Sequence, residues 1–425
     1  MPTNPSVTVR MYNMGFGDAF LITVTDDGPP WRMLIDCGAH SQGLARPIRE
    51  SVAAIVADLT AMCPGTPPHL DVVVATHHHA DHISGFAVDA WEQVEVDEVW
   101  LPFVEDEHDP DAALLRANQT GIAQTLQALI DRRARGLEEG HWPAALYAAQ
   151  TFAANSLGNE AATDRLLGRG GQHFAQPHRV RFLPSTNPDD NVIKVGERVT
   201  IHALGPSRLP EELKLMNPPS NAGWLQLSPG SYDGAGGGGG GGDDTLSLFD
   251  PQFLVDAAQA DTLPDDLTAT LATLHLDSLT NDEGLLAAAS ILEGAVNNTS
   301  VFLVLDVNGK RFIFPGDAQY GAWKHILDDP ASKQLLVDAA FYKIGHHGSY
   351  NATPRQFVTE IWNDGGYAML PWGLVKRWQD TIPKRELIAA LQSHHHTVIR
   401  ADHAEAVDGA VTVHEDLWSE VLFAT

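Results

Sequence analysis

The chain has few of the features that mark secreted or membrane proteins. It contains only two cysteines, Cys37 and Cys63, in 425 residues, too few for a disulfide framework and consistent with a reducing compartment. No run of about 18 apolar residues occurs, so no transmembrane helix is expected. The opening segment MPTNPSVTVRMYN lacks the basic and apolar regions of a signal peptide. Together these absences predict a cytoplasmic protein that does not associate with a membrane.

Basic residues are also scarce. Lysine and arginine total 27 and aspartate and glutamate total 55, which gives a formal net charge of 27 − 55 = −28. Such a surface repels polyanions and lacks the broad basic footprint of a free nucleic-acid binder. We therefore expect the ligand to be either a small anionic substrate or a nucleic acid that a partner protein presents.

What the chain does contain is a series of short apolar runs that alternate with helical patterns. Hydrophobic residues make up 44% of the sequence, enough for a large core. Strand-like runs concentrate in the first hundred residues, resume in RVRFLP and ERVTIHALGPS near residues 179–207, and return after residue 300. This pattern predicts a layered α/β or α+β fold, with α+β preferred, over a single domain, 1–425. Segment 105–180 is predicted to be a helical insertion. Segment 219–290 is predicted to be a second insertion, and either insertion is a candidate contact for a protein partner.

The second insertion contains an uninterrupted glycine run at 236–242. The conformational freedom of glycine predicts a flexible loop there. The run does not contain the GxxxxGK[ST] pattern, so the sequence does not favour a phosphate-cradling role for it.

Four of the short apolar runs end in acidic or imidazole side chains. In MLIDCG the apolar run is followed by Asp36, and in VVVATHHHADH it is followed by the cluster 77–82. In RFIFPGDA it is followed by Asp317, and in FYKIGHHGS by His346 and His347. If these strands are parallel neighbours, their ends meet at one edge, which is where α/β sheets bind ligands. The combination of imidazoles and carboxylates predicts a metal site at that edge.

The spacing within the cluster THHHADH allows its side chains to contribute to two neighbouring metal positions. In an extended segment His77 and His79 point to the same side, while His78 points to the opposite side. Asp81 and His82 follow, at a turn into a helix, and can face a second position. Zinc accepts nitrogen and oxygen ligands of this kind and keeps an open position in catalytic sites.

These motifs resemble the metallo-β-lactamase fold, whose His-x-His-x-Asp-His signature matches His77, His79, Asp81 and His82. A finer resemblance is to the ComEC-like branch of that fold. It is carried by GFGDAFLI at 15–22, MLIDCG at 33–38, NNTS at 297–300, GD at 316–317 and HHGS at 346–349. The resemblance implies a four-layer αββα sandwich, interrupted here by the helical insertion and the glycine-rich insertion.

The resemblance also implies two divalent ions, with Zn²⁺ expected and Mn²⁺ as the alternative. The implied metal ligands are His77, His79, Asp81, His82, Asp317 and His347. Asp36 matches the family position that orients a ligand imidazole. Many members place a further histidine where this chain has Asn297 or Asn298. An amide oxygen is a weaker zinc ligand, so the first metal position is expected to be under-ligated or to hold a harder ion.

The implied activity is a metal-dependent hydrolase, most simply a phosphodiesterase or nuclease that uses a metal-bound hydroxide. Asp81 would fix the second ion, and His346 would protonate the leaving group or hydrogen-bond to it. Ser349 and Lys343 are the candidates for contact with the substrate anion. Two alternatives stay open: a lactone, ester or thioester hydrolase of the same fold, and a metal-binding subunit whose site is gated by a partner.

Overall fold

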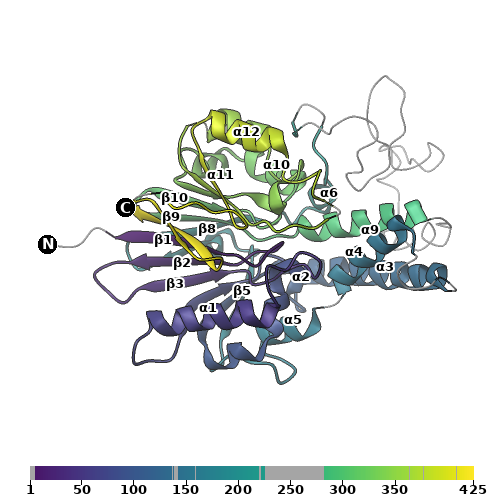
Figure 1. Cartoon of the computed structure of the whole chain (residues 1–425), viewed down its shortest axis with the longest axis horizontal. Helices are drawn as coiled ribbons and strands as arrows, with labels where there is room; N and C mark the ends of the chain where they lie inside the picture. The colour runs from purple at the N-terminus through teal and green to yellow at the C-terminus, as the bar shows by residue number, and fades with distance from the viewer. Residues whose placement is uncertain are drawn as a thin grey trace.

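The computed structural model describes residues 5–135, 137, 142–157, 159–219, 222–224, 282–362, 364–376, 378–407 and 409–425. Its strands form two mixed sheets (Figure 1). The first sheet has eight strands in the spatial order β14 (Val411–His414), β15 (Trp418–Ala424), β1 (Ser6–Tyr12), β2 (Phe20–Thr25), β3 (Trp31–Ile35), β4 (His69–Val74), β5 (Glu95–Pro102) and β6 (Arg179–Leu183). Strands β3 to β6 run parallel to one another, and β1, β2 and β15 pair antiparallel.

The second sheet has seven strands, and its parallel part comes from the C-terminal region. The spatial order is β13 (Thr397–Arg400), β12 (Tyr367–Leu370), β11 (Phe341–Lys343), β10 (Lys310–Phe314), β9 (Phe302–Val307), β8 (Val199–Gly205) and β7 (Val192–Val195). Strands β10 to β13 are parallel, and β7 to β10 are antiparallel. The β9–β10 hairpin turns through Asn308 and Gly309, both with positive φ, as the Asn-Gly pair predicts.

The two sheets face each other across a core of alternating apolar residues. Val7 and Val9 of β1 and Leu303 and Leu305 of β9 belong to this core and are at most 2% exposed. Because side chains alternate between the two faces of a strand, every second residue contributes to this layer. The residues between them in sequence point to the outer faces, where helices cover them.

Helices cover the outer face of each sheet. Helix α1 (Ile48–Met62) lies on the first sheet, where its apolar stripe, which includes Val52, Ile55 and Leu59, is buried. Helix α5 (Glu160–Leu167) packs on the same side. Helices α10 (Tyr320–Asp328), α11 (Pro330–Leu335) and α12 (Arg385–Ser393) lie over the second sheet (Figure 1). The layers therefore run helix, sheet, sheet, helix, and the predicted α+β class is confirmed.

In the segment predicted as a helical insertion, 105–180, the described residues form three helices. Helices α3 (Pro110–Ala134) and α4 (Ala144–Leu157) pack on α9 (Asp282–Asn297) around their own apolar core, at one end of the molecule (Figure 1). Helix α3 starts at Asp109, whose carboxylate accepts hydrogen bonds from the first free amides of the helix, with a proline at the first helical position. Residues 225–281, which include the glycine run 236–242, lie outside the described residues.

Short turns complete the described structure. They are α2 (Ala80–Ile83), α6 (Pro210–Leu213), 3-10 turns at Ser84–Ala87, Asp89–Gln93, Phe103–Glu105, Pro188–Asn191 and Gly345–Gly348, and a π turn at Phe357–Ile361. Among the residues described, no helix combines the length and apolarity needed to cross a membrane.

Candidate metal centre

The loops that follow β3, β4, β10 and β11 meet at one edge of the sandwich. Asp36 follows β3 and the cluster 77–82 follows β4 in the first sheet, while Asp317 follows β10 and the pair 346–347 follows β11 in the second. The predicted meeting of four strand ends therefore occurs. The arrangement differs from a single parallel sheet, because each sheet contributes one parallel pair, β3–β4 and β10–β11.

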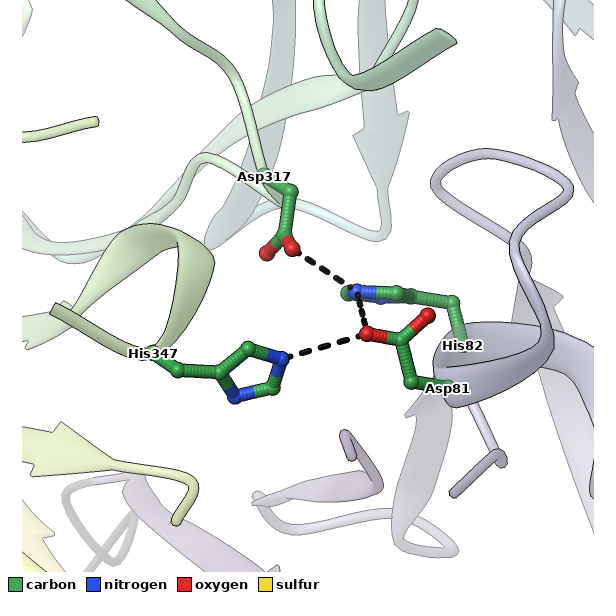
Figure 2. Close-up of side chains that lie close together, drawn as sticks. All are labelled: Asp81, His82, Asp317 and His347. Carbon is green, nitrogen blue, oxygen red and sulfur yellow. Dashed lines mark hydrogen bonds and ion pairs between the residues drawn. The ribbon is translucent and has the colours of Figure 1, made fainter. Parts of the chain in front are cut away.

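Four buried donors lie at the centre of this edge, and Figure 2 shows how they converge. One nitrogen or carboxylate oxygen from each of Asp81, His82, Asp317 and His347 lies within 4.8 Å of the others. His82 Nε2 is 3.1 Å from Asp317 Oδ2, and His347 Nε2 is 3.2 Å from Asp81 Oδ2. Two of these residues come from each sheet, so the site forms only when the two sheets pack.

His77 and His79 lie beside this group, and His78 points away, as the strand alternation predicts. His77 Nε2 is 3.0 Å from His79 Nδ1, and the ring of His77 lies 4.1 Å from that of His82. His78 instead places Nδ1 3.1 Å from a carboxylate oxygen of Glu105. The three histidines at 77–79 therefore divide into two imidazoles at the site and one that points away from it.

The state of these imidazoles suits cation binding. Burial lowers the pKa of His79 to about 3 and lowers that of His77 well below its usual value, so both rings are neutral at neutral pH. Neutral imidazole is the form that binds metal ions. His79 Nε2 is buried and has no hydrogen-bond partner among the described residues. A buried nitrogen of this kind, next to carboxylates, fits a bound divalent cation.

Asp36 holds His82 in place, which is the position that the resemblance implies. Its Oδ2 accepts a hydrogen bond of 2.7 Å from His82 Nδ1, and its Oδ1 accepts one of 2.7 Å from the Thr76 amide. This contact leaves Nε2 of His82 directed at the group of four donors. Asp36 adopts φ 58°, a left-handed conformation that aspartate tolerates better than most residues.

His82 lies among several carboxylates. Burial opposes a positive charge on its ring, but Asp317, Asp18 and Asp36 outweigh that effect and raise the pKa of His82 well above its usual value. Binding of a metal at Nε2 would therefore displace a proton from that atom.

Lys343 and Asp18 form a buried ion pair that the sequence pattern does not predict. Lys343 is 2% exposed, and its ammonium lies 2.5 Å from Asp18 Oδ2, 3.0 Å from Asp317 Oδ1 and 2.8 Å from the Gly316 carbonyl oxygen. These contacts use all three ammonium hydrogens. The prediction that Lys343 contacts the substrate is corrected accordingly, because its charge is directed at the protein's own carboxylates.

A signal for this pair was present in the sequence. Lys343 follows Phe341 and Tyr342 in an apolar strand, where an amine is rarely buried without a carboxylate partner. Asp18 is 1% exposed, and its backbone amide donates to the Asp81 carbonyl. The missing information was which carboxylate lies opposite the lysine.

The turn after β11 separates the roles of its two histidines. His347 belongs to the group of four donors, as predicted, and its Nδ1 donates to the Pro371 carbonyl at 2.9 Å. His346 is less buried, and its Nδ1 lies 3.0 Å from Ser349 Oγ. His346, His347 and Gly348 all have positive φ, a run that is costly for residues with a Cβ. This strained turn points the two rings in different directions.

The two asparagines also separate. Asn298 donates to the carbonyls of Leu213 and Leu215 and accepts from the Gln319 amide, so its side chain is committed to the α6 region and is not free to act as a ligand. Asn297 Nδ2 lies 3.4 Å from His346 Nε2, and its Oδ1 is buried with no partner among the described residues. Of the two positions named in the sequence analysis, only Asn297 therefore lies at the site.

No family model matches this chain, and comparison with curated proteins finds no match either. The chemical interpretation therefore depends on the residues of the site.

Proposed function

We propose that this chain is a metal-dependent hydrolase of metallo-β-lactamase type that cleaves phosphodiesters. The observation that carries the proposal is the buried convergence of Asp81, His82, Asp317 and His347 from two facing sheets. Carboxylates and imidazoles in this mixture are the donors that zinc and manganese accept. The helix, sheet, sheet, helix layering supports the same family.

The residues that would hold divalent ions are His77, His79, Asp81, His82, Asp317 and His347. Such an ion supplies Lewis acidity toward a phosphoryl oxygen and acidifies water at neutral pH. Asp36 keeps a proton on Nδ1 of His82 and so directs Nε2 into the site. Asp317 Oδ1 accepts hydrogen bonds from Lys343 and from the His346 amide, which leaves Oδ2 facing the other donors.

His346 is the residue best placed to assist a leaving group. It adjoins the donor cluster without belonging to it, and Ser349 Oγ lies 3.0 Å from its Nδ1. Burial lowers the pKa of His346, so a neutral ring would hydrogen-bond to the departing oxygen. The net charge of −28 favours a small diester, or a nucleic acid that a partner presents, over free duplex DNA.

The first experiment measures hydrolysis of bis(p-nitrophenyl) phosphate and of a labelled single-stranded oligonucleotide by zinc-loaded and manganese-loaded protein. We expect turnover that falls about 100-fold or more in the double variant Asp81→Ala/His82→Ala, because these side chains hold the second ion. His78→Ala is the matched control, since His78 lies in the same segment but points to Glu105. Its rate should stay within about twofold of wild type.

Each outcome separates the hypotheses. Preference for the small diester or for the oligonucleotide distinguishes a small-diester enzyme from a nuclease. Loaded protein that cleaves neither, or a double variant as active as wild type, would contradict the proposal. Cleavage of a lactone or thioester alone would assign carbon-ester chemistry to the same centre.

A further inference from the structure

A second charge cluster, centred on Lys343, adjoins the proposed metal site. Asp18 and Lys343 are 1% and 2% exposed, and the ammonium of Lys343 lies between the carboxylates of Asp18 and Asp317. Asp317 is the member that this cluster shares with the group of four donors. Any change in the charge around Lys343 therefore acts on the metal site through Asp317.

The two oxygens of Asp317 have different partners. Oδ1 accepts from Lys343 at 3.0 Å and from the His346 amide at 3.0 Å, whereas Oδ2 lies 3.1 Å from His82 Nε2. The contacts at Oδ1 fix the rotation of the carboxylate, so a single oxygen is presented to the site. A rigid carboxylate of this kind is preorganised for its ligand.

Lys343 also has an electrostatic cost for cation binding. The positive charge of Lys343 partly neutralises the Asp317 carboxylate and so weakens its attraction for a metal ion. The same positive charge also repels the ion directly. Asp18 opposes both effects, because its carboxylate contacts the same ammonium at 2.5 Å. With Asp18 in place, the Asp18–Lys343 pair is formally neutral. The negative charge of Asp317 can then attract a metal ion at the proposed site.

We infer that Asp18 is a positioning residue that neutralises Lys343, so that Lys343 can orient Asp317 without weakening its binding of the metal ion. This inference rests on the proposed metal site. It assigns a role to the carboxylate of Asp18 in the GFGDAFLI segment, which is buried and lies 3.7 Å from His82 Nδ1, beyond hydrogen-bond distance. A purely structural ion pair would stabilise the fold without changing metal affinity.

The test compares the zinc affinity of the wild type with that of one single and one double variant, measured by competition with a chromophoric chelator in protein stripped of metal and reloaded. Asp18→Asn keeps the size and one acceptor but removes the charge, and it should weaken zinc binding about tenfold or more. Asp18→Asn/Lys343→Met removes both charges of the pair, and its zinc affinity should return to within about threefold of wild type. Unfolding of each metal-free variant by urea reports stability separately.

The chain offers a matched control in a second buried cation that lies between two carboxylates. Arg10 contacts Asp58 and Glu420, away from the metal donors. Asp58→Asn should lower the urea midpoint but leave zinc affinity unchanged.

The outcomes are distinguishable. A wild-type chain that binds no zinc overturns the proposed function and this inference together. Zinc binding that Asp18→Asn leaves unchanged, or that the double variant fails to restore, overturns the inference alone. Circular dichroism of the metal-free proteins identifies any variant that fails to fold. If Asp18→Asn fails to fold, the double variant, which lacks both charges of the Asp18–Lys343 pair, still tests the inference: zinc affinity far below that of the wild type would overturn it.

Discussion

At the scale of single residues, the geometry of the centre depends on a glycine as well as on charged side chains. Gly316 precedes Asp317 and has φ 57°, and a Cβ at this position would lie 2.9 Å from the Cβ atoms of Thr76 and Ser300. Ser300 Oγ accepts a hydrogen bond from the Asp317 amide and lies 3.2 Å from His77 Nδ1. The close approach at Gly316 therefore sets how near the loops of the two sheets come.

We expect Gly316→Ala to lower the free energy of unfolding by about 2–4 kcal/mol, from left-handed strain plus overpacking. Gly196→Ala is the control, because Gly196 has φ 62° but no atom within 4 Å of the added Cβ. That variant should cost about 1 kcal/mol, from the strain alone. Urea unfolding of the metal-free proteins measures both, and equal costs would show that the close approach does not matter.

At the scale of elements, helices α3, α4 and α9 form a unit with its own core. Leu126 of α3 is 0% exposed in that core, and Phe152 of α4 stacks on Trp378, 6.2 Å between ring centroids. Trp378 in turn packs on Phe16, whose ring lies 3.8 Å from that of His347. A row of aromatic rings thus connects the helical unit to the loop that carries His347, while the unit's apolar core is made mainly of its own helices.

Because the helical unit has its own core, we expect a cavity in that core to destabilise the three helices more than the sheets. Leu126→Ala should cost about 2–5 kcal/mol of local stability and speed amide exchange in α3, α4 and α9, with little change in β1 to β5. Leu59→Ala, the same substitution at a fully buried position of α1, should instead speed exchange across the first sheet. Hydrogen exchange measured by mass spectrometry compares the two. An equal rise in both sheets for Leu126→Ala would show that the helices belong to the same cooperative unit.

At the scale of the whole molecule, the dominant property is the charge of −28. The candidate metal donors are buried, so a substrate of the proposed hydrolase would approach through the field of the acidic surface. An oligonucleotide carries many negative charges and is repelled at long range, whereas a small diester carries one. Ionic strength should therefore affect the two substrates differently.

We expect kcat/KM for a single-stranded oligonucleotide to rise about threefold or more between 0.01 and 0.15 M salt. Over that interval the screening length falls from about 30 to about 8 Å and reduces the repulsion. The value for the small diester should change by less than about 1.5-fold. Initial rates at fixed free metal concentration measure both. A rate on the oligonucleotide that falls with salt would instead indicate an attractive basic channel on this chain.

The sequence alone was sufficient for the features that depend on local periodicity. Alternation along the segment 77–79 correctly separated His78 from its neighbours, and the apolar runs predicted the strands that end at the site. The Asn-Gly pair at the β9–β10 turn is likewise typical of a tight hairpin. These features follow from neighbouring residues, because a strand repeats every two residues and a tight turn needs particular backbone angles. The roles of His346 and Ser349 and the identity of the metal stay predictions.

Only the tertiary structure decided how distant segments meet. It divided the four strand ends between two sheets, placed Asn297 rather than Asn298 at the site, and paired Lys343 with Asp18. No local pattern encodes these contacts, because each joins residues from distant parts of the chain. These contacts depend on which faces the two sheets bury against each other. A buried charge or amide needs a hydrogen-bond or ion-pair partner, and the packing of the sheets determines which groups are close enough to provide one.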